Sequence, residues 1–232
     1  MKKENNECKQ DDLFKKNIFS KGQFEFNKDV VNVFDDMIER SIPFYDSLQQ
    51  MIAAIVDTFF VSGTNIYDLG CSTGNSVVSM AKVLSDKDKR FTIFGYDQSS
   101  DMIATCLKKL EVYDFKDRVV LDSCDITSPF QMVDASVVLL NLVLQFIQPN
   151  LRLQVVQNIY DLLLPGGCLI LVEKIDSSTP IMRQFYKSQY YNYKKQQGYS
   201  QLEIDYKEQA LTNVLVPFSP TQNVNLLKDA GF

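Results

Sequence analysis

A glycine-containing turn that follows a short apolar run constrains the fold of this chain most strongly. The run Ile66–Leu69 leads into Gly70–Gly74, and a helical pattern follows from Asn75 to about Leu84. Gly70 can adopt a positive φ, which lets the backbone approach a ligand closely. No Lys-Ser/Thr pair follows the second glycine, so the turn lacks the phosphate-gripping residues of a triphosphate loop. This pattern favours a nucleoside site in an α/β protein, although such a turn also serves tight packing alone.

A polar side chain stands at the end of each of four apolar runs. The runs and their polar groups are 66–69 with Asp68, 90–97 with Asp97, 118–126 with Asp125, and 135–141 with Asn141. In parallel sheets such groups converge on the crevice outside the carboxyl ends of the strands, where ligands bind. We expect Asp97 to bind two ribose hydroxyls, Asp125 to accept from an adenine amino group, and Asp68 to accept from an amino group. Capping of the next helix is the alternative role for Asp97, although Ser99 could do the same.

S-adenosylmethionine is the ligand that the turn and the strand-end acids favour together. An adenosyl group with an amino-acid tail suits this turn better than a triphosphate does. Transfer from such a ligand needs no histidine, because the sulfonium is already activated and the protein mainly supplies orientation and electrostatics.

The apolar runs alternate with helical patterns, which indicates βαβ units in one doubly wound, mostly parallel sheet. The helical patterns cover 75–84, 101–110 and 150–164, and a fifth apolar run covers 168–173. A chain of 232 residues with 45% hydrophobic residues can bury one sizeable core. We expect a single Rossmann-like α/β domain over 13–232, after a polar, disordered segment at 1–12. Helices at about 28–60 would form a cap, and helices at about 178–212 a lid.

Composition argues against several classes of function. With 24 basic and 29 acidic residues, the net charge of −5 gives no general electrostatic footprint for nucleic acid. The five cysteines are scattered without paired metal-ligand spacing and are typical of reduced thiols in a cytosolic protein. No apolar run approaches ~20 residues, so we expect a cytoplasmic protein without a membrane span. The absence of histidine removes the commonest zinc ligand, and we expect no metal.

Several segments carry a closer resemblance to a known family. They are Val33–Tyr45, Tyr67–Ser72, Leu144–Phe146, Gly198–Ser200 and Leu211–Leu215. In these segments the chain resembles the bacterial carboxy-S-adenosylmethionine synthases, over about residues 13–232. The resemblance implies a class I methyltransferase fold that converts S-adenosylmethionine and prephenate to carboxy-S-adenosylmethionine and phenylpyruvate. It also implies a homodimer and a functional link to a tRNA carboxymethyltransferase that modifies a wobble uridine, without direct tRNA binding by this chain.

The resemblance further implies which residues contact S-adenosylmethionine or carboxy-S-adenosylmethionine. Matched motif by motif, the contacts are Tyr45, Gly70, Cys71, Ser72, Asp97, Gln98, Asp125, Ile126 and Asn141. The strand-end pattern adds Asp68 to this set. No catalytic residue is implied, because in the family's proposed reaction the fragmentation of prephenate supplies the base.

Glu208 departs from the family pattern. The family has an arginine at this position, which reaches across the homodimer to the added carboxylate of carboxy-S-adenosylmethionine. A carboxylate in its place loses a bidentate contact and adds like-charge repulsion, so the site should prefer S-adenosylmethionine. Lys207 is a candidate substitute, although neighbours on a helix point in different directions. The alternative is a solvated Glu208, with the match displaced by one residue.

The C-terminal third departs from related folds in a second way. In those folds Ala230–Phe232 would lead into two more strands, so we expect five parallel strands and a fifth strand whose edge a partner or loop covers. The tyrosine- and lysine-rich helix at 182–195 is interpreted as a lid in which Phe185, Tyr186 and Tyr190 pack over the crevice. Stacking on RNA is the alternative role for this helix.

Three classes of function fit these patterns. The favoured one is an enzyme resembling the carboxy-S-adenosylmethionine synthases. A conventional S-adenosylmethionine-dependent methyltransferase acting on a small acceptor is the second, and Glu208 favours it. The third is a non-catalytic protein that binds S-adenosylmethionine.

Overall fold

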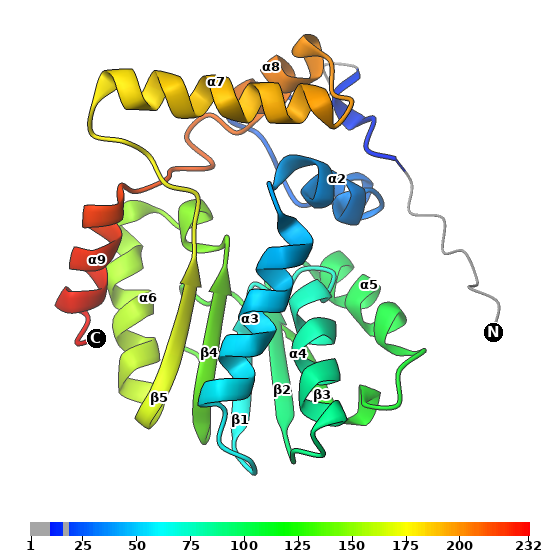
Figure 1. Cartoon of the computed structure of the whole chain (residues 1–232), viewed down its shortest axis with the longest axis vertical. Helices are drawn as coiled ribbons and strands as arrows, with labels where there is room; N and C mark the ends of the chain where they lie inside the picture. Colours follow the sequence, from blue (N-terminus) through cyan, green and yellow to red (C-terminus); the bar gives the residue numbers. More distant parts are fainter. Residues whose placement is uncertain (1–9, 16–18) are drawn as a thin grey trace.

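A computed structural model describes residues 10–15 and 19–232, in which five parallel strands form one sheet (Figure 1). The strands are β1 (Asn65–Leu69), β2 (Thr92–Asp97), β3 (Val119–Ser123), β4 (Ala135–Asn141) and β5 (Leu163–Val172). Their order is β3-β2-β1-β4-β5, with parallel pairing throughout. The chain therefore reverses its direction of winding beside β1, and a crevice opens there at the carboxyl ends of the strands.

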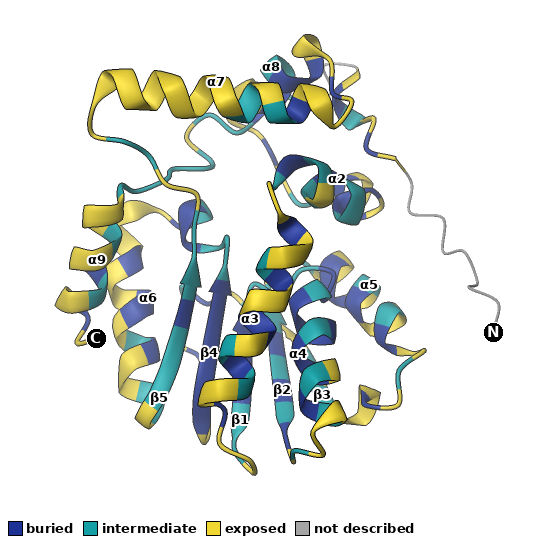
Figure 2. Ribbon diagram, in the orientation of Figure 1, coloured by how far each residue is buried: buried dark blue, intermediate teal, exposed yellow. Residues whose placement is uncertain are grey.

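Helices cover both faces of this sheet, as the alternating pattern predicts. One face carries α3 (Tyr45–Phe59), α4 (Asn75–Asp86) and α5 (Ser100–Leu110), and the other carries α6 (Pro149–Leu162) and α9 (Pro220–Asp229). Adjacent residues of β1 point to opposite faces, so Ile66 packs with the first group of helices and Tyr67 with the second. Both faces of β1 and β4 are consequently buried (Figure 2).

Cap and lid helices lie beyond the carboxyl ends of the strands (Figure 1). The cap contains α1 (Lys28–Val31) and α2 (Phe34–Ser41), and the lid contains α7 (Pro180–Gln196) and α8 (Gln201–Ala210). Three short 3-10 helices complete the described elements: η1 (Leu13–Lys15), η2 (Lys116–Arg118) and η3 (Leu144–Phe146). An apolar cluster that includes Phe14, Phe34 and Ala210 joins cap and lid. Most of α7 is exposed (Figure 2).

The predicted disordered segment 1–12 lies mostly outside the described residues, and its described end differs from the prediction. Asp11 is buried, and its N–H donates to Asp36 Oδ2 at 2.6 Å. The Tyr199 hydroxyl donates to Asp11 Oδ2 at 2.6 Å. The prediction of disorder was wrong at Asp11, because a residue far away in the sequence supplies the hydrogen bond that makes its burial favourable.

Candidate active site

The glycine turn lies at the end of β1 and is held by β2. The N–H groups of Gly70 and Cys71 both donate to the Tyr96 carbonyl, at 2.7 and 3.0 Å. Gly70 has a φ of 86°, and a β-carbon there would lie 2.5 Å from Val143 Cγ2. The position therefore requires glycine both for its backbone conformation and for space.

The Asp97 carboxylate lies at the end of β2 and is oriented by two backbone donors. Its Oδ2 accepts from the Ser72 N–H at 3.0 Å, and its Oδ1 accepts from the Ser99 N–H at 2.9 Å. The residue that caps α5 is Ser99, whose hydroxyl accepts from the Met102 N–H. Asp97 is thus not needed as the helix cap, and it lines a cavity.

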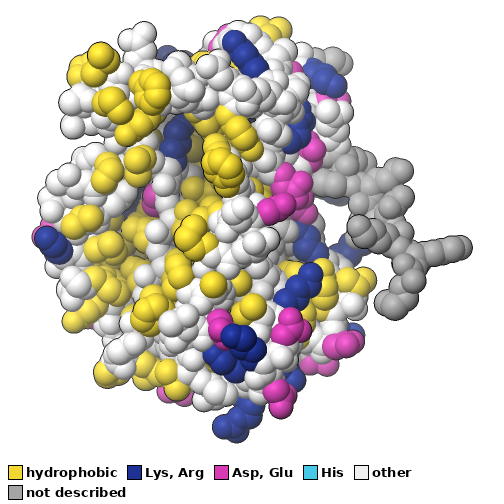
Figure 3. Space-filling view, in the orientation of Figure 1, with side chains coloured by type: hydrophobic (Ala, Val, Ile, Leu, Met, Phe, Trp, Pro, Cys, Tyr) yellow, Lys and Arg dark blue, Asp and Glu magenta, His cyan; other side chains and the backbone are white. Residues whose placement is uncertain are grey.

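A cavity of about 1040 Å³ runs from the strand ends to the helices above them, and apolar side chains surround its opening (Figure 3). It brings together nine of the ten predicted site residues. These nine are Tyr45, Gly70, Cys71, Ser72, Asp97, Gln98, Asp125, Ile126 and Asn141. The tenth, Asp68, is 1% exposed and does not belong to the lining.

Buried acceptors without partners lie in and beneath this cavity. Both carboxylate oxygens of Asp68, and Oδ1 of Asn141, have no hydrogen-bond partner in the part of the chain that the structure describes. Burial, and secondarily the charge of Asp97, raises the pKa of Asp68 to about 7. Burial also raises the pKa of Asp97, against the effect of its two backbone donors. The orphaned acceptors of Asp68 and Asn141, together with the nearby Asp97 carboxylate, favour a cationic donor. The ammonium and sulfonium groups of S-adenosylmethionine supply that charge, so these residues fit this ligand.

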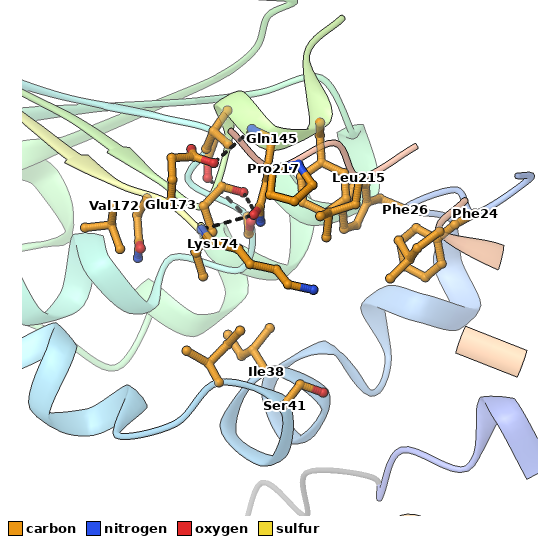
Figure 4. A pocket seen from close by; sticks show the side chains of 18 of the residues that line it. Phe24, Phe26, Ile38, Ser41, Gln145, Val172, Glu173, Lys174, Leu215 and Pro217 are labelled. Carbon is orange, nitrogen blue, oxygen red and sulfur yellow. Dashed lines mark hydrogen bonds between the residues drawn. The ribbon is translucent and has the colours of Figure 1, made fainter. Parts of the chain in front are cut away.

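Glu173 and Lys174 follow β5 and point in different directions (Figure 4). Glu173 accepts from the N–H groups of Leu144 and Gln145, at 2.7 and 2.9 Å, and so holds η3 in place. Burial raises the pKa of Glu173 to about 7, although these donors oppose the shift. Lys174 extends across the cavity toward Ser41 (Figure 4). Glu173 and Lys174 were not among the residues predicted from the sequence, although both are polar residues at the end of the fifth apolar run.

Glu208 lines the upper part of the cavity and has partners of its own. It forms an ion pair with Lys187 at 2.5 Å and accepts a hydrogen bond from the Tyr191 hydroxyl. Burial acts to raise the pKa of Glu208, but the bonds from Lys187 and Tyr191 bring it below its ordinary value. Lys207 reaches the same cavity, although it is the adjacent, preceding residue on the helix. Its Nζ donates to Ser41 Oγ at 3.2 Å.

The lid interpretation of α7 holds for two of its three aromatic residues. Tyr186 and Tyr190 line the cavity, whereas Phe185 does not and is 52% exposed. The buried Lys194 also lines the cavity from this helix. The spacing of the lysines in α7 carries no signal that separates Lys194 from its exposed neighbour Lys195, so the sequence did not identify Lys194 as a site residue.

The described helices and the described metal-ligating side chains bear on whether this chain has a membrane span or a metal site. None of the described helices combines the length and the apolar character that crossing a membrane requires. Within 10–15 and 19–232, no cluster of three or more histidine, cysteine, aspartate or glutamate side chains could hold a metal ion.

Comparison with known proteins identifies the class of this fold. A family model described as a methyltransferase domain matches residues 67–169. A putative S-adenosyl-L-methionine-dependent methyltransferase of Methanococcus maripaludis superposes with a TM-score of 0.59 at 18% identity, over 91% of this chain and 88% of the other. An O-methyltransferase family protein of Burkholderia thailandensis gives a TM-score of 0.63 at 16% identity, over 86% of this chain and 54% of the other.

Sequence relatives narrow the class further. The carboxy-S-adenosyl-L-methionine synthase of Methylococcus capsulatus is 38% identical over 96% of this chain and 91% of its own length. The carboxy-S-adenosyl-L-methionine synthase of Desulfotalea psychrophila is 42% identical over 90% of this chain and 84% of its own length. Fold and site define an S-adenosylmethionine-dependent transferase of the class I methyltransferase type. Within that class, the chain belongs to the carboxy-S-adenosyl-L-methionine synthase family.

Proposed function

We propose that the protein converts S-adenosylmethionine and prephenate to carboxy-S-adenosylmethionine and phenylpyruvate. The reaction balances when the carbon dioxide lost by prephenate becomes bonded to the methyl carbon. The proton that this carbon loses then leaves with the hydroxyl of prephenate as water. One observation carries the proposal: the cavity continues from the nucleoside crevice into a second region under α7 and α8, which is lined by cationic side chains. That region offers space for a second, anionic substrate beside the first.

In this proposal the nine lining residues and Asp68 hold S-adenosylmethionine, which supplies an activated methyl group. Asp97 accepts from the two ribose hydroxyls with lone pairs that its backbone donors leave free. The unpartnered Oδ1 of Asn141, which lines the cavity, accepts from the ammonium group, and the buried Asp68 beneath the cavity supplies negative charge. Asp125 and Ile126 contact the adenine. Gly70, Cys71 and Ser72 form the backbone surface against which the amino-acid tail lies.

The proposal extends to the setting of the enzyme. We place it in the cytoplasm as a homodimer whose product serves a tRNA carboxymethyltransferase that modifies a wobble uridine. The exposed apolar side chains of α7 support association, since Ile181 is 76% and Phe185 52% exposed. Direct tRNA binding is not part of the proposal, because Tyr186 and Tyr190 of α7 line the same cavity as the residues assigned to S-adenosylmethionine.

Glu208 favours a second candidate, a methyltransferase that acts on a small acceptor. Its carboxylate lies in the cavity and would repel the added carboxylate of carboxy-S-adenosylmethionine. Lys187 offsets part of that charge through its ion pair.

Mass spectrometry separates the two candidates. The protein is purified from bacterial cells and denatured, and the mass of the released nucleoside is measured. A mass greater than that of S-adenosylmethionine by one carbon dioxide supports the synthase. S-adenosylmethionine or its demethylated product favours the methyltransferase. Incubation with S-adenosylmethionine and prephenate then tests turnover directly, and the absence of carboxy-S-adenosylmethionine would refute the synthase proposal.

A further inference from the structure

Three lysines converge on the upper part of the cavity from three different elements. Lys174 follows β5, Lys194 lies on α7, and Lys207 lies on α8, and all three line the cavity. Lys194 and Lys207 are only 5% and 7% exposed. Buried ammonium groups are rare unless a counter-charge accompanies them, so this convergence calls for a partner.

None of the three ammonium groups forms an ion pair within residues 10–15 and 19–232. The Nζ atoms of Lys174 and Lys194 lie 4.9 and 4.6 Å from the centroid of the Tyr190 ring. The ring attracts both charges but accepts no ordinary hydrogen bond from them. Lys207 donates to the Ser41 hydroxyl, which leaves two of its three donors unused. Lys174 projects into the open space of the cavity (Figure 4).

The carboxylates near this cluster already have donors of their own. Glu208 is paired with Lys187 and Tyr191, and Asp176 is paired with Arg183 at 2.9 Å. Glu173 accepts two backbone N–H groups, as described above. Asp11, whose charge acts on Lys194 and Lys207, accepts from the Tyr199 hydroxyl and the Leu13 N–H. The protein therefore engages its negative groups and leaves three positive ones facing the cavity.

Without a bound anion, burial disfavours the charged forms of Lys194 and Lys207. Burial, and then the charges of Lys207 and Lys174, pushes the pKa of Lys194 well below its ordinary value. Burial also lowers the pKa of Lys207 to about 8. An anion bound among the lysines would relieve both effects, because it supplies the missing counter-charge.

We propose that Lys174, Lys194 and Lys207 bind the carboxylates of a small organic diacid, the second substrate of the reaction. This inference deepens the proposed function and rests on it. The cavity volume of about 1040 Å³ lies at the upper end of the roughly 300–1,000 Å³ that is typical of ligand pockets, and the lysines line a part of it apart from the strand-end residues assigned to S-adenosylmethionine. Three ammonium groups from three elements suit two carboxylates better than one. Prephenate, which carries two carboxylates, is the probe of choice.

The test measures prephenate binding by calorimetry, with the protein saturated by S-adenosylhomocysteine so that no methyl group reacts. Lys194→Met should weaken prephenate binding roughly tenfold or more and leave the affinity for S-adenosylhomocysteine unchanged. It should also raise the midpoint of thermal unfolding, since it removes an unpaired buried charge. Lys195→Met is the matched control, because Lys195 is the next residue of α7 and is exposed; it should change none of the three quantities.

Three results would overturn the inference. The first is wild-type prephenate affinity in Lys194→Met. The second is a lowered unfolding midpoint together with a weakened affinity for S-adenosylhomocysteine, which would make Lys194 a structural residue. The third is equal affinity for prephenate and the monocarboxylate phenylpyruvate, which would exclude a two-carboxylate site. If Lys194→Met does not fold, Lys174→Met is subjected to the same measurements, because Lys174 is exposed.

Turnover of the wild-type protein separates this inference from the proposed function. Lysine-dependent binding of prephenate without formation of carboxy-S-adenosylmethionine would refute the synthase proposal and still support the diacid site. Formation of the product, with prephenate bound equally well by Lys174→Met, Lys194→Met and the wild type, would refute the site and leave the synthase proposal standing.

Discussion

Replacement of Gly70 by alanine tests the central turn, because two separate effects should add at this position. The left-handed backbone costs an alanine roughly 1–2 kcal/mol. The new β-carbon would lie 2.5 and 3.1 Å from the two γ-carbons of Val143, and overpacking of this kind costs typically about 1–3 kcal/mol. We expect Gly70→Ala to lower the free energy of unfolding by about 2–5 kcal/mol in urea denaturation, and to weaken binding of S-adenosylmethionine because the turn must shift.

Gly166 provides the matched control for the backbone effect. It also has a positive φ, 79°, but no atom lies within 4 Å of the β-carbon position. Gly166→Ala should therefore cost only the roughly 1–2 kcal/mol of the left-handed backbone. Val143→Ala in the Gly70→Ala background should recover most of the steric part, and the double-mutant cycle measures that coupling. Equal costs at Gly70 and Gly166, or no recovery in the double variant, would refute the close-approach argument.

Three further predictions concern ligands. Asp97→Ala should weaken S-adenosylmethionine binding by about 2 kcal/mol or more, because ribose hydroxyls lose their acceptor; unchanged affinity by calorimetry, with the fold intact, would remove Asp97 from the site. Glu208→Arg should shift the ratio of affinities toward carboxy-S-adenosylmethionine, and a constant ratio would show that Glu208 does not lie at the carboxylate position. The pKa of Asp68 is raised to about 7. Protonated Asp68 therefore makes its full contribution to the free energy of unfolding below about pH 4, and this contribution is lost as the pH rises through 7. The affinity for S-adenosylmethionine should rise over the same interval, because the ionised carboxylate attracts the cationic ligand. Asp68→Asn should flatten both profiles, and a persisting slope in affinity would assign the effect to another group.

The strands and the lower half of the site were predictable because local patterns encode them. An apolar run that ends in an acid specifies both the strand and the place of its last side chain, whatever lies elsewhere in the chain. The same reasoning located Asp97 and Asn141, and it identified Ser99 as a possible cap.

The upper half was not predictable from local patterns. Lys194 and Lys195 are adjacent lysines on one helix, and only the packing of α7 over the cavity makes the first buried and the second exposed. Asp11 looked like part of a solvated segment, because its partner Tyr199 is remote in sequence. Tertiary contacts decide both cases, and hydrophobic periodicity carries no information about them.

The tie between Asp11 and Tyr199 has a mechanical consequence. Arg40 of α2 stacks on the same tyrosine ring at 4.1 Å and donates to the Gln197 carbonyl at the end of α7. These bonds fasten the lid to the cap, whereas the lid reaches the sheet through the connecting segments on either side of α7 and α8. Lid and cap thus form one connected layer above the cavity. The next helix, α3, begins at Tyr45, only four residues after α2 ends. A displacement of the lid would therefore also shift the start of α3, where Tyr45 lines the cavity.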